Sequence, residues 1–284
     1  MKFSDINIRD PFILPDNGVY YLYGSRSHDP AQRYCQTGFD VYTSTDLENW
    51  SQPKAIFECT PEFWGERDFW APEVHRYQGK YYLFATFNSE TVGRGTAILI
   101  SDTPDGPFRE HSEGSITPKD WECLDGTLYI DENGTPYMVF CHEWLQIQNG
   151  TVCAVELTKD LKAPVGEPVL LWSAGDASWV RDLRGNGSYV TDGPFLFKKD
   201  GQLMSIWSSF DKKGYVQAIA KSAGGILGPW TVDYEPLLAG HDGGHGMLFT
   251  TFEGVEKFIC HQPNKFPNER PTLYTVEDGK FIKD

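Results

Sequence analysis

Residues 124–140 read LDGTLYIDENGTPYMVF, in which an acidic residue heads an apolar strand and a Gly-containing turn leads into a second, aromatic strand. The same unit occurs five times along the chain. Its ionisable heads are Asp10 (RDPFIL), Glu73 (APEVHRY), Asp125 (LDGTLYI), Asp192 (TDGPFLF) and His245 (GGHGMLF). Successive heads are 63, 52, 67 and 53 residues apart. Since one such unit cannot bury its own apolar faces, a repeat of about 59 residues predicts a radial array.

Each repeat also contains a third strand, a polar turn and a fourth strand. The third strands resemble one another: residues 39–44 (FDVYTS), 96–102 (TAILISD), 151–157 (TVCAVEL) and 216–222 (VQAIAKS). Four strands in each of five repeats predict an all-β fold, a five-bladed β-propeller with four antiparallel strands per blade. A β-sandwich or barrel is the rival, because its short strands look alike locally. No low-complexity linker divides residues 1–284, so we expect a single propeller domain.

The charge balance narrows the class of partner. The formal net charge is −15, with 25 Lys and Arg against 40 Asp and Glu. Phosphate binding needs clustered basic residues, so this balance argues against nucleic acid. No basic amphipathic segment suggests a membrane partner, and no apolar run approaches the ~20 residues of a membrane span. The first residues, MKFSDINIRD, lack the apolar region of a signal peptide, which predicts a cytoplasmic protein.

Strand direction predicts which side chains share one end of the propeller. If each first strand starts at the mouth of the central channel, each second strand must return to that mouth. The second strands then bring their last residues to the same place: Ser25, Phe87, His142, Glu143, Ser209 and His261. Trp70 stands just before Glu73 in FWAPEV and would form the floor of a pocket. An Asp before Gly or Pro is usually a turn residue, but recurrence at the repeat heads favours a site.

Four carboxylic acids are therefore expected around one cavity: Asp10, Asp125, Asp192 and Glu143. Clustered carboxylates raise one another's pKa, so that one group stays protonated beside an ionised neighbour. Glycoside hydrolysis needs this division, because a carboxylic acid protonates the leaving oxygen while a carboxylate activates water or attacks the sugar. The nine Trp, 14 Tyr and 18 Phe residues also supply rings on which sugars stack. Hydrolysis of a neutral glycan is the function that these residues favour.

As an ordered set, RDPFI, FWAPEV, LDGTLYIDENGTPY, the xGP strand head and GGHG resemble glycoside hydrolase family 43 over essentially the full chain. The resemblance implies a five-bladed propeller that acts by inversion on arabinose- and xylose-containing glycans. It implies that Asp10 is the base and that Asp125 orients the acid and tunes its pKa. The family's acid is usually Glu in an EGP strand head, whereas TDGP places Asp192 there.

Asp192 departs from this pattern, because its side chain is one methylene, about 1.5 Å, shorter than Glu. Three interpretations stay open. Asp192 is the acid with a substrate seated closer, Glu143 has taken over protonation, or the chain is a sugar-binding module without activity.

His245 matches the family's axial histidine, which commonly lies beside a calcium or other ion in the channel. One imidazole is a poor sole ligand for a hard cation that prefers oxygen, so water would supply most of the shell. We therefore expect an ion near His245 to be structural or electrostatic rather than hydrolytic. Arg270 in NERPTLY resembles a substrate-contacting arginine.

These observations predict an inverting glycoside hydrolase that releases α-L-arabinofuranosyl or β-D-xylosyl units from plant-derived oligosaccharides such as arabinoxylan fragments. An endo-acting arabinanase on the same fold and a non-catalytic carbohydrate-binding propeller are the alternatives. The expected substrate-binding side chains are Trp70, Glu73, Phe87, His142, Ser209, His261 and Arg270. The expected partner is an oligosaccharide. The pattern does not choose between arabinose and xylose and does not determine the oligomeric state.

Overall fold

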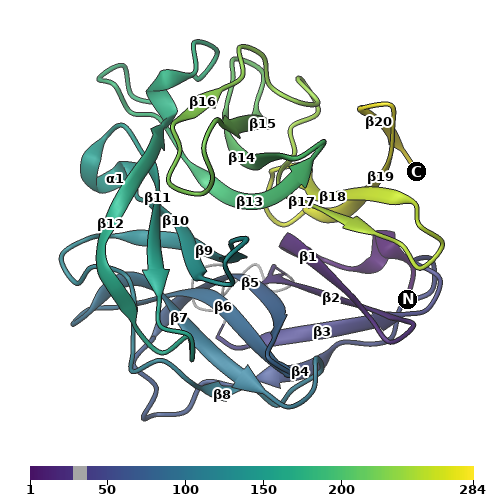
Figure 1. Cartoon of the computed structure of the whole chain (residues 1–284). Helices are drawn as coiled ribbons and strands as arrows, with labels where there is room; N and C mark the ends of the chain where they lie inside the picture. Colours follow the sequence, from purple (N-terminus) through teal and green to yellow (C-terminus); the bar gives the residue numbers. More distant parts are fainter. Residues whose placement is uncertain (28–36) are drawn as a thin grey trace.

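The computed structural model describes residues 1–27 and 37–284. Their strands form five four-stranded sheets in which strands that follow one another in the sequence pair antiparallel. Figure 1 shows these sheets around a central axis, with β1, β5, β9, β13 and β17 innermost. Each sheet comes from one sequence repeat, so the predicted five-bladed propeller is confirmed.

The strands have the following bounds. The first blade comprises β1 (Ile8–Asp16), β2 (Val19–Arg26), β3 (Phe39–Ser44) and β4 (Lys54–Phe57). The second comprises β5 (Arg67–Tyr77), β6 (Lys80–Ser89), β7 (Gly93–Ser101) and β8 (Arg109–Glu110). The third comprises β9 (Cys123–Ile130), β10 (Pro136–His142), β11 (Thr151–Leu157) and β12 (Pro164–Ser173). The last two are β13 (Asp192–Lys199), β14 (Gln202–Phe210), β15 (Tyr215–Ser222) and β16 (Trp230–Val232), then β17 (Gly244–Thr250), β18 (Glu256–Gln262), β19 (Arg270–Glu277) and β20 (Lys280–Lys283).

Helical structure in the described residues is limited to short segments, including η1 (Phe3–Asp5), α1 (Trp144–Ile147) and η3 (Ala174–Asp176). Within this part of the chain, no helix is both long enough and apolar enough to cross a membrane.

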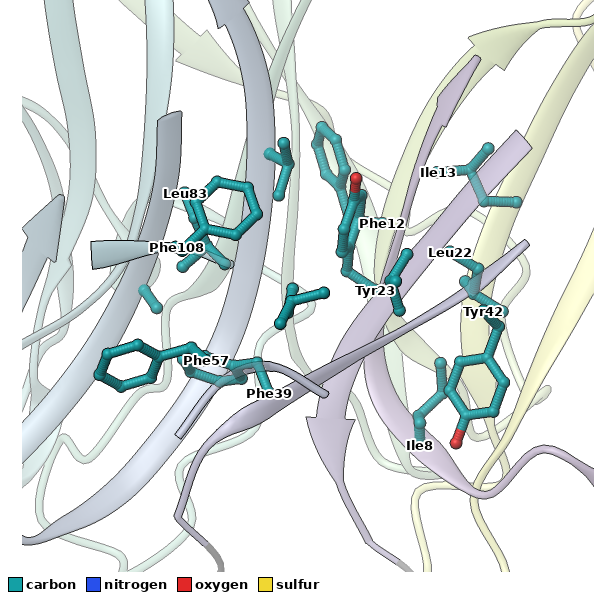
Figure 2. Packing of buried hydrophobic residues seen from close by; sticks show 14 of the residues in the cluster. Ile8, Phe12, Ile13, Leu22, Tyr23, Phe39, Tyr42, Phe57, Leu83 and Phe108 are labelled. Carbon is teal, nitrogen blue, oxygen red and sulfur yellow. The ribbon is translucent and has the colours of Figure 1, made fainter. Parts of the chain in front are cut away.

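The core lies between the blades, because each blade packs its faces against two neighbours. Strand β6 shows the effect most clearly, since every residue from Tyr81 to Ser89 is buried. A strand covered on both faces has no polar alternation, which explains its run of aromatic and apolar residues. Figure 2 shows side chains of the first blade, such as Phe12 and Tyr23, in one apolar cluster with Leu83 and Phe108 of the second.

The ends of the chain close the ring through polar contacts between the first and last blades. The amide of Asn7 donates to the carbonyl oxygens of Pro267 (3.0 Å) and Glu269 (2.7 Å). Arg9 forms an ion pair with the buried carboxylate of Glu269 at 3.0 Å. These contacts stabilise the seam where β1 lies beside β17.

All five innermost strands carry a β-bulge at the same level, where two residues oppose a single residue of the second strand. At this shared level, the first residue of the bulge is left-handed in every blade: Asp10 (φ 52°), Ala71 (47°), Asp125 (56°), Gly193 (51°) and His245 (52°). A non-glycine residue in this region is strained, and such strain concentrates at functional sites. A bulge also re-aims the side chain, so this ring of bulges sets what faces the mouth of the channel.

The positions of the bulges show which residues of the five repeats are equivalent, and in two blades this residue is not the predicted head. Asp10, Asp125 and His245 occupy the left-handed position as expected. Glu73 lies two residues beyond its bulge and Asp192 one residue before its own, because Ala71 and Gly193 occupy the left-handed position in those blades. Three of the five bulged residues precede a proline, in Asp10–Pro11, Ala71–Pro72 and Gly193–Pro194. That X–Pro step is the sequence signal that aligns the blades correctly.

Candidate active site

Side chains near the bulges accept hydrogen bonds from the backbone N–H groups that the bulges leave without a partner in the sheet. Five such hydrogen bonds form, Asp10 N to His261 Nδ1 (3.2 Å), Ala71 N to Ser25 Oγ (2.7 Å), Asp125 N to Thr86 Oγ1 (2.9 Å), Gly193 N to Asp125 Oδ2 (2.9 Å) and His245 N to Ser208 Oγ (2.8 Å). A buried N–H without an acceptor is costly, so these polar side chains hold the bulges in place. They also explain why His261 and Ser25 stand at the ends of second strands.

A cavity of about 260 Å³ opens at the level of the bulges. It is lined by Arg9, Asp10, Ser25, Arg26, Ser27, Trp70, Arg94, Leu124, Asp125, Glu143, Trp144, Leu145, Asp192, Tyr215, His245 and Phe266. Each of the five blades contributes at least one strand residue to this lining. The structure thus brings together all four predicted carboxylic acids, with Trp70 and His245.

Asp10 is surrounded by groups that favour its ionised form. Its Oδ2 accepts a hydrogen bond from Ser25 Oγ at 2.6 Å, and its Oδ1 lies 3.3 Å from His245 Nδ1. Burial raises the pKa of Asp10, but the electrostatic effects of His245 and Arg9 and the Ser25 hydrogen bond outweigh it. The pKa of Asp10 is therefore lowered, which suits a carboxylate that accepts a proton.

Asp125 lies beside Asp10 and has the opposite tendency. Its Oδ2 accepts the Gly193 N–H at 2.9 Å and lies 3.6 Å from His245 Nδ1. Burial, together with the negative charge of Asp10, raises the pKa of Asp125 well above its usual value. Because Gly193 follows Asp192, this hydrogen bond ties Asp125 to the backbone that carries Asp192.

Asp192 is held by a phenol from the third strand of its own blade. Tyr215 Oη donates to Asp192 Oδ2 at 2.9 Å. Burial raises the pKa of Asp192 to about 8, and the charges of Asp125 and Glu143 add to the effect. A carboxylic acid with this pKa keeps its proton at neutral pH and can donate it.

Glu143 enters the cavity from the residue that precedes α1, and an arginine holds it. Arg94 donates to Glu143 Oε2 at 2.7 Å and to Asp68 Oδ2 at 2.9 Å, and its guanidinium stacks over Trp70 at 4.8 Å. Burial raises the pKa of Glu143, and Arg94 offsets only part of that shift, so the pKa stays above its usual value. An arginine at this distance stabilises the ionised form of a carboxylate, which counts against Glu143 as the proton donor.

The comparisons with known proteins settle the family. The sequence profile of glycosyl hydrolases family 43 matches residues 4–277. The chain belongs to glycosyl hydrolases family 43. The crystal structure of an endo-arabinase from Bacteroides thetaiotaomicron superposes with a TM-score of 0.90 at 42% identity, covering 99% of both chains.

Curated relatives are more distant. An extracellular endo-α-(1→5)-L-arabinanase of Bacillus subtilis is 25% identical over 218 residues, 72% of this chain and 60% of that protein. A β-D-galactofuranosidase of Aspergillus niger is 25% identical over 275 residues, 89% of this chain and 72% of that protein. This family 43 chain therefore spans less than two thirds of the length of the Bacillus relative.

Several predicted substrate-binding residues of this family 43 protein lie outside the cavity lining. Phe87 is fully buried and packs edge to face on Phe63 and Phe69, each at 4.9 Å. Ser209 Oγ is also buried and donates to the carbonyl oxygen of Val190 at 2.6 Å. Both side chains stabilise the fold here and cannot touch a molecule in the cavity without rearrangement.

Two further predicted residues support the cavity from behind. His261 is completely buried beneath Asp10, and burial together with Arg9 lowers the pKa of His261 to about 3. Glu73, displaced by its bulge, forms a pair with His75 at 3.0 Å. Neither His261 nor Glu73 lines the cavity.

The last two predicted substrate-binding residues, His142 and Arg270, make their contacts away from the cavity. The imidazole of His142 stacks on Trp121 at 4.1 Å and 9°, and its Nε2 is 2.7 Å from Gln146 Oε1. Arg270 donates to the carbonyl oxygens of Ser4 (3.0 Å) and Glu269 (2.7 Å), so it ties the last blade to the N-terminal segment.

The residues around His245 do not form a protein-held calcium site. Among the residues that the structure describes, no three His, Cys, Asp or Glu side chains are grouped as metal ligands. His245 Nδ1 instead faces Asp10 and Asp125. Calcium takes six to eight oxygen ligands, so an ion at His245 with a shell made mostly of water stays a prediction.

Sequence reasoning missed Arg94 and Tyr215, which contact two of the carboxylic acids. Arg94 stands between two glycines in GRGTA. A Cβ at Gly95 would lie 2.1 Å from Ser115 Oγ and one at Gly93 2.9 Å from Glu122 Oε1. The two glycines therefore let the strand that carries Arg94 pack closely against its neighbours. In the sequence alone, this pair of glycines looks the same as the glycines of a loop.

Proposed function

We propose that this chain is an inverting glycosidase that cleaves α-L-arabinofuranosyl linkages in plant-derived oligosaccharides, acting at chain ends. The observation that carries the proposal is the opposite pKa shift of two carboxyl groups in one cavity, lowered at Asp10 and raised to about 8 at Asp192. Pairs of groups whose environments separate their pKa values are typical acid and base partners.

In the proposed reaction, Asp10 accepts a proton from a water molecule as its oxygen bonds to the anomeric carbon. The bond between that carbon and the glycosidic oxygen breaks on the opposite face of the sugar, and Asp192 gives its proton to the leaving oxygen. Asp125 positions the Asp192 backbone through its hydrogen bond with Gly193. Proton exchange with solvent then returns Asp10 to its ionised form and Asp192 to its protonated form.

The relatives support a furanoside substrate. The Bacillus relative is named as an arabinanase and the Aspergillus relative as a galactofuranosidase. The cavity of about 260 Å³ is slightly smaller than the ~300–1000 Å³ typical of small-ligand pockets, which supports a single terminal sugar rather than an open groove. β-D-Xylosides are the second substrate class to test.

Endo-acting arabinanase activity is the second candidate function. The Bacteroides structure at 42% identity is that of an endo-arabinase, which favours internal cleavage. Product size separates the two modes, since exo action on linear arabinan releases only arabinose from the first minutes, whereas endo action releases a ladder of oligosaccharides.

The test is a panel of aryl arabinofuranosides and xylosides and linear arabinan, run on the parent protein and on Asp10→Ala, Asp192→Asn and Glu143→Gln. We expect release of arabinose by the parent, with kcat lowered about 10²–10⁴-fold by Asp192→Asn. Glu143→Gln should lower kcat/KM less than Asp192→Asn does. Near-parental turnover in Asp192→Asn with collapse in Glu143→Gln would transfer the acid role to Glu143. Oligosaccharide binding without release of reducing sugar by the parent would support the non-catalytic alternative.

A further inference from the structure

A second hollow of about 370 Å³ adjoins the cavity on the mouth side of the second blade. Three segments form its walls: Trp64 ahead of β5, the turn at Thr91 and Val92 between β6 and β7, and the connection from Glu113 to Trp121 that leads to β9. Arg94 lines both this hollow and the cavity.

We propose that this hollow is a remote subsite that binds a further sugar residue of the glycan whose scissile bond lies in the cavity. The inference rests on the proposed function and extends it, because it makes an oligosaccharide rather than a simple glycoside the preferred substrate. The hollow is not a part of the carboxylate cluster, and none of the predicted site residues lines it.

Two tryptophans supply rigid rings at this position. Trp121 is half-buried, and its stacking on His142 at 4.1 Å fixes the orientation of its ring. Trp64 is also half-buried and packs on Phe63 at 5.9 Å and Phe87 at 5.8 Å. Sugar rings present faces of C–H groups that pack on aromatic rings, and a ring already held in place loses little conformational entropy on binding.

Polar groups around these rings suit a neutral polyhydroxylated ligand. Lys119 and Glu113 are exposed at the edge of the hollow, and Ser115 Oγ pairs with Thr117 Oγ1 at 2.8 Å beside them. They provide donors and acceptors for hydroxyl groups. Lys119 and Glu113 offset each other, and the charge of Arg94 is paired with Asp68 and Glu143, so the hollow has no excess of charge that would select an anionic ligand.

Arg94 connects the two sites. Its guanidinium is held by Asp68 and Glu143 and stacks on Trp70, while its backbone N–H donates to Glu122 Oε2 at 3.1 Å. A residue fixed on every side acts as a rigid wall between the cavity and the hollow. A glycan with its terminal sugar in the cavity would pass over this wall, so that a later sugar of the chain reaches Trp64 and Trp121.

The test compares chain lengths in protein variants. Val92, 39% exposed at the edge of the hollow, is changed to Asp, and Trp121→Ala removes a platform, with thermal melting to confirm that each variant folds. The matched control is Val165→Asp, since Val165 is 46% exposed on β12 and lines neither site. The probes are an aryl arabinofuranoside and linear arabino-oligosaccharides of two to six residues.

For the parent, kcat/KM should rise with chain length until the hollow is filled. We expect Val92→Asp and Trp121→Ala to lower the ratio of kcat/KM for the longest oligosaccharide to that for the aryl glycoside by about tenfold. Val165→Asp should leave that ratio unchanged. Calorimetric titration of Asp10→Asn with the same oligosaccharides gives a second readout, in which the gain in affinity with length should vanish when Val92→Asp is added.

The outcomes separate the two proposals. Hydrolysis of the aryl glycoside by the parent with no dependence on chain length, or equal loss in the control, would overturn the remote subsite alone. Failure of the parent to hydrolyse or bind every probe would overturn the proposed function, and the subsite with it.

Discussion

Tyr215 and Asp192 form a pair in which the buried phenol donates a 2.9 Å hydrogen bond to the half-buried carboxyl group. The hydrogen bond favours the ionised form of Asp192 and so limits how far burial raises its pKa. Tyr215 is itself fixed by its neighbours, since its ring stacks on His261 at 5.6 Å and fills space that a Cβ at Gly244 would need. The phenol is therefore placed to stabilise the charge that Asp192 acquires when it gives up its proton.

Tyr215→Phe should lower kcat about 10–100-fold, because a hydrogen bond to a charged group contributes about 1.5–3 kcal/mol. The same change should raise the pKa of Asp192 and move the alkaline limb of the kcat/KM profile to higher pH. The measurement is the pH–rate profile on an aryl arabinofuranoside. A lower kcat with an unmoved alkaline limb would mean that Tyr215 has only a packing role.

Ser25→Ala should instead shift the acidic limb of the kcat/KM profile. Ser25 Oγ donates to Asp10 Oδ2 at 2.6 Å, and this hydrogen bond helps to lower the pKa of Asp10. Without it the pKa of Asp10 rises, so activity should be lost at a higher pH as the solution is acidified. Ser25→Thr, which keeps the hydroxyl, is the control. Identical acidic limbs in the Ala and Thr variants would contradict this role.

Asp192→Asn should stabilise the fold at neutral and alkaline pH while it removes activity. The pKa of an unfolded Asp is about 3.9, whereas burial raises that of folded Asp192 to about 8. The folded state therefore keeps a proton that the unfolded chain releases, and the stability of the parent falls as pH rises through the window between these values.

Asparagine does not titrate, so Asp192→Asn should melt roughly 2–5 °C above the parent at pH 8.5, with the difference shrinking towards pH 4. Thermal melts over this range are the measurement. Glu235→Gln, an exchange at an exposed position, is the control and should show no such trend. A variant less stable than the parent at alkaline pH would refute the assigned shift.

Phe87→Ala should destabilise the fold by about 3–5 kcal/mol, because it leaves a cavity among packed phenylalanines. Its kcat and KM below the melting transition should stay close to the parental values, since Phe87 does not line the cavity. Urea unfolding and steady-state kinetics are the measurements. Tyr234→Ala, at a side chain 88% exposed, should change stability by less than about 0.5 kcal/mol. A large rise in KM without loss of stability would restore Phe87 as a substrate contact.

The fold could be predicted because its signal repeats. Apolar strands that open with an ionisable residue and turn through a glycine recur five times, and five weak signals at one period support one another. Asp10, Asp125 and His245 could be placed at the mouth for the same reason, since each occupies the bulge of its own innermost strand. Glu73 could not be aligned correctly, because the residue that carries the bulge in its blade is Ala71, whose side chain has no chemistry to mark it.

The amino-acid sequence by itself determined the propeller, the family pattern and the identity of the clustered carboxylic acids, because these follow from periodicity and from local residue order. Only the tertiary structure decided what each acid can do. The pKa of a carboxyl group depends on burial and on charges that come from distant segments, as Asp10 depends on His245 and Asp192 on Tyr215. The same holds for Arg94, whose partners Asp68 and Glu143 lie 26 and 49 residues away along the chain. Asp68 meets Arg94 when the second blade folds, and Glu143 meets it when the third blade packs against the second.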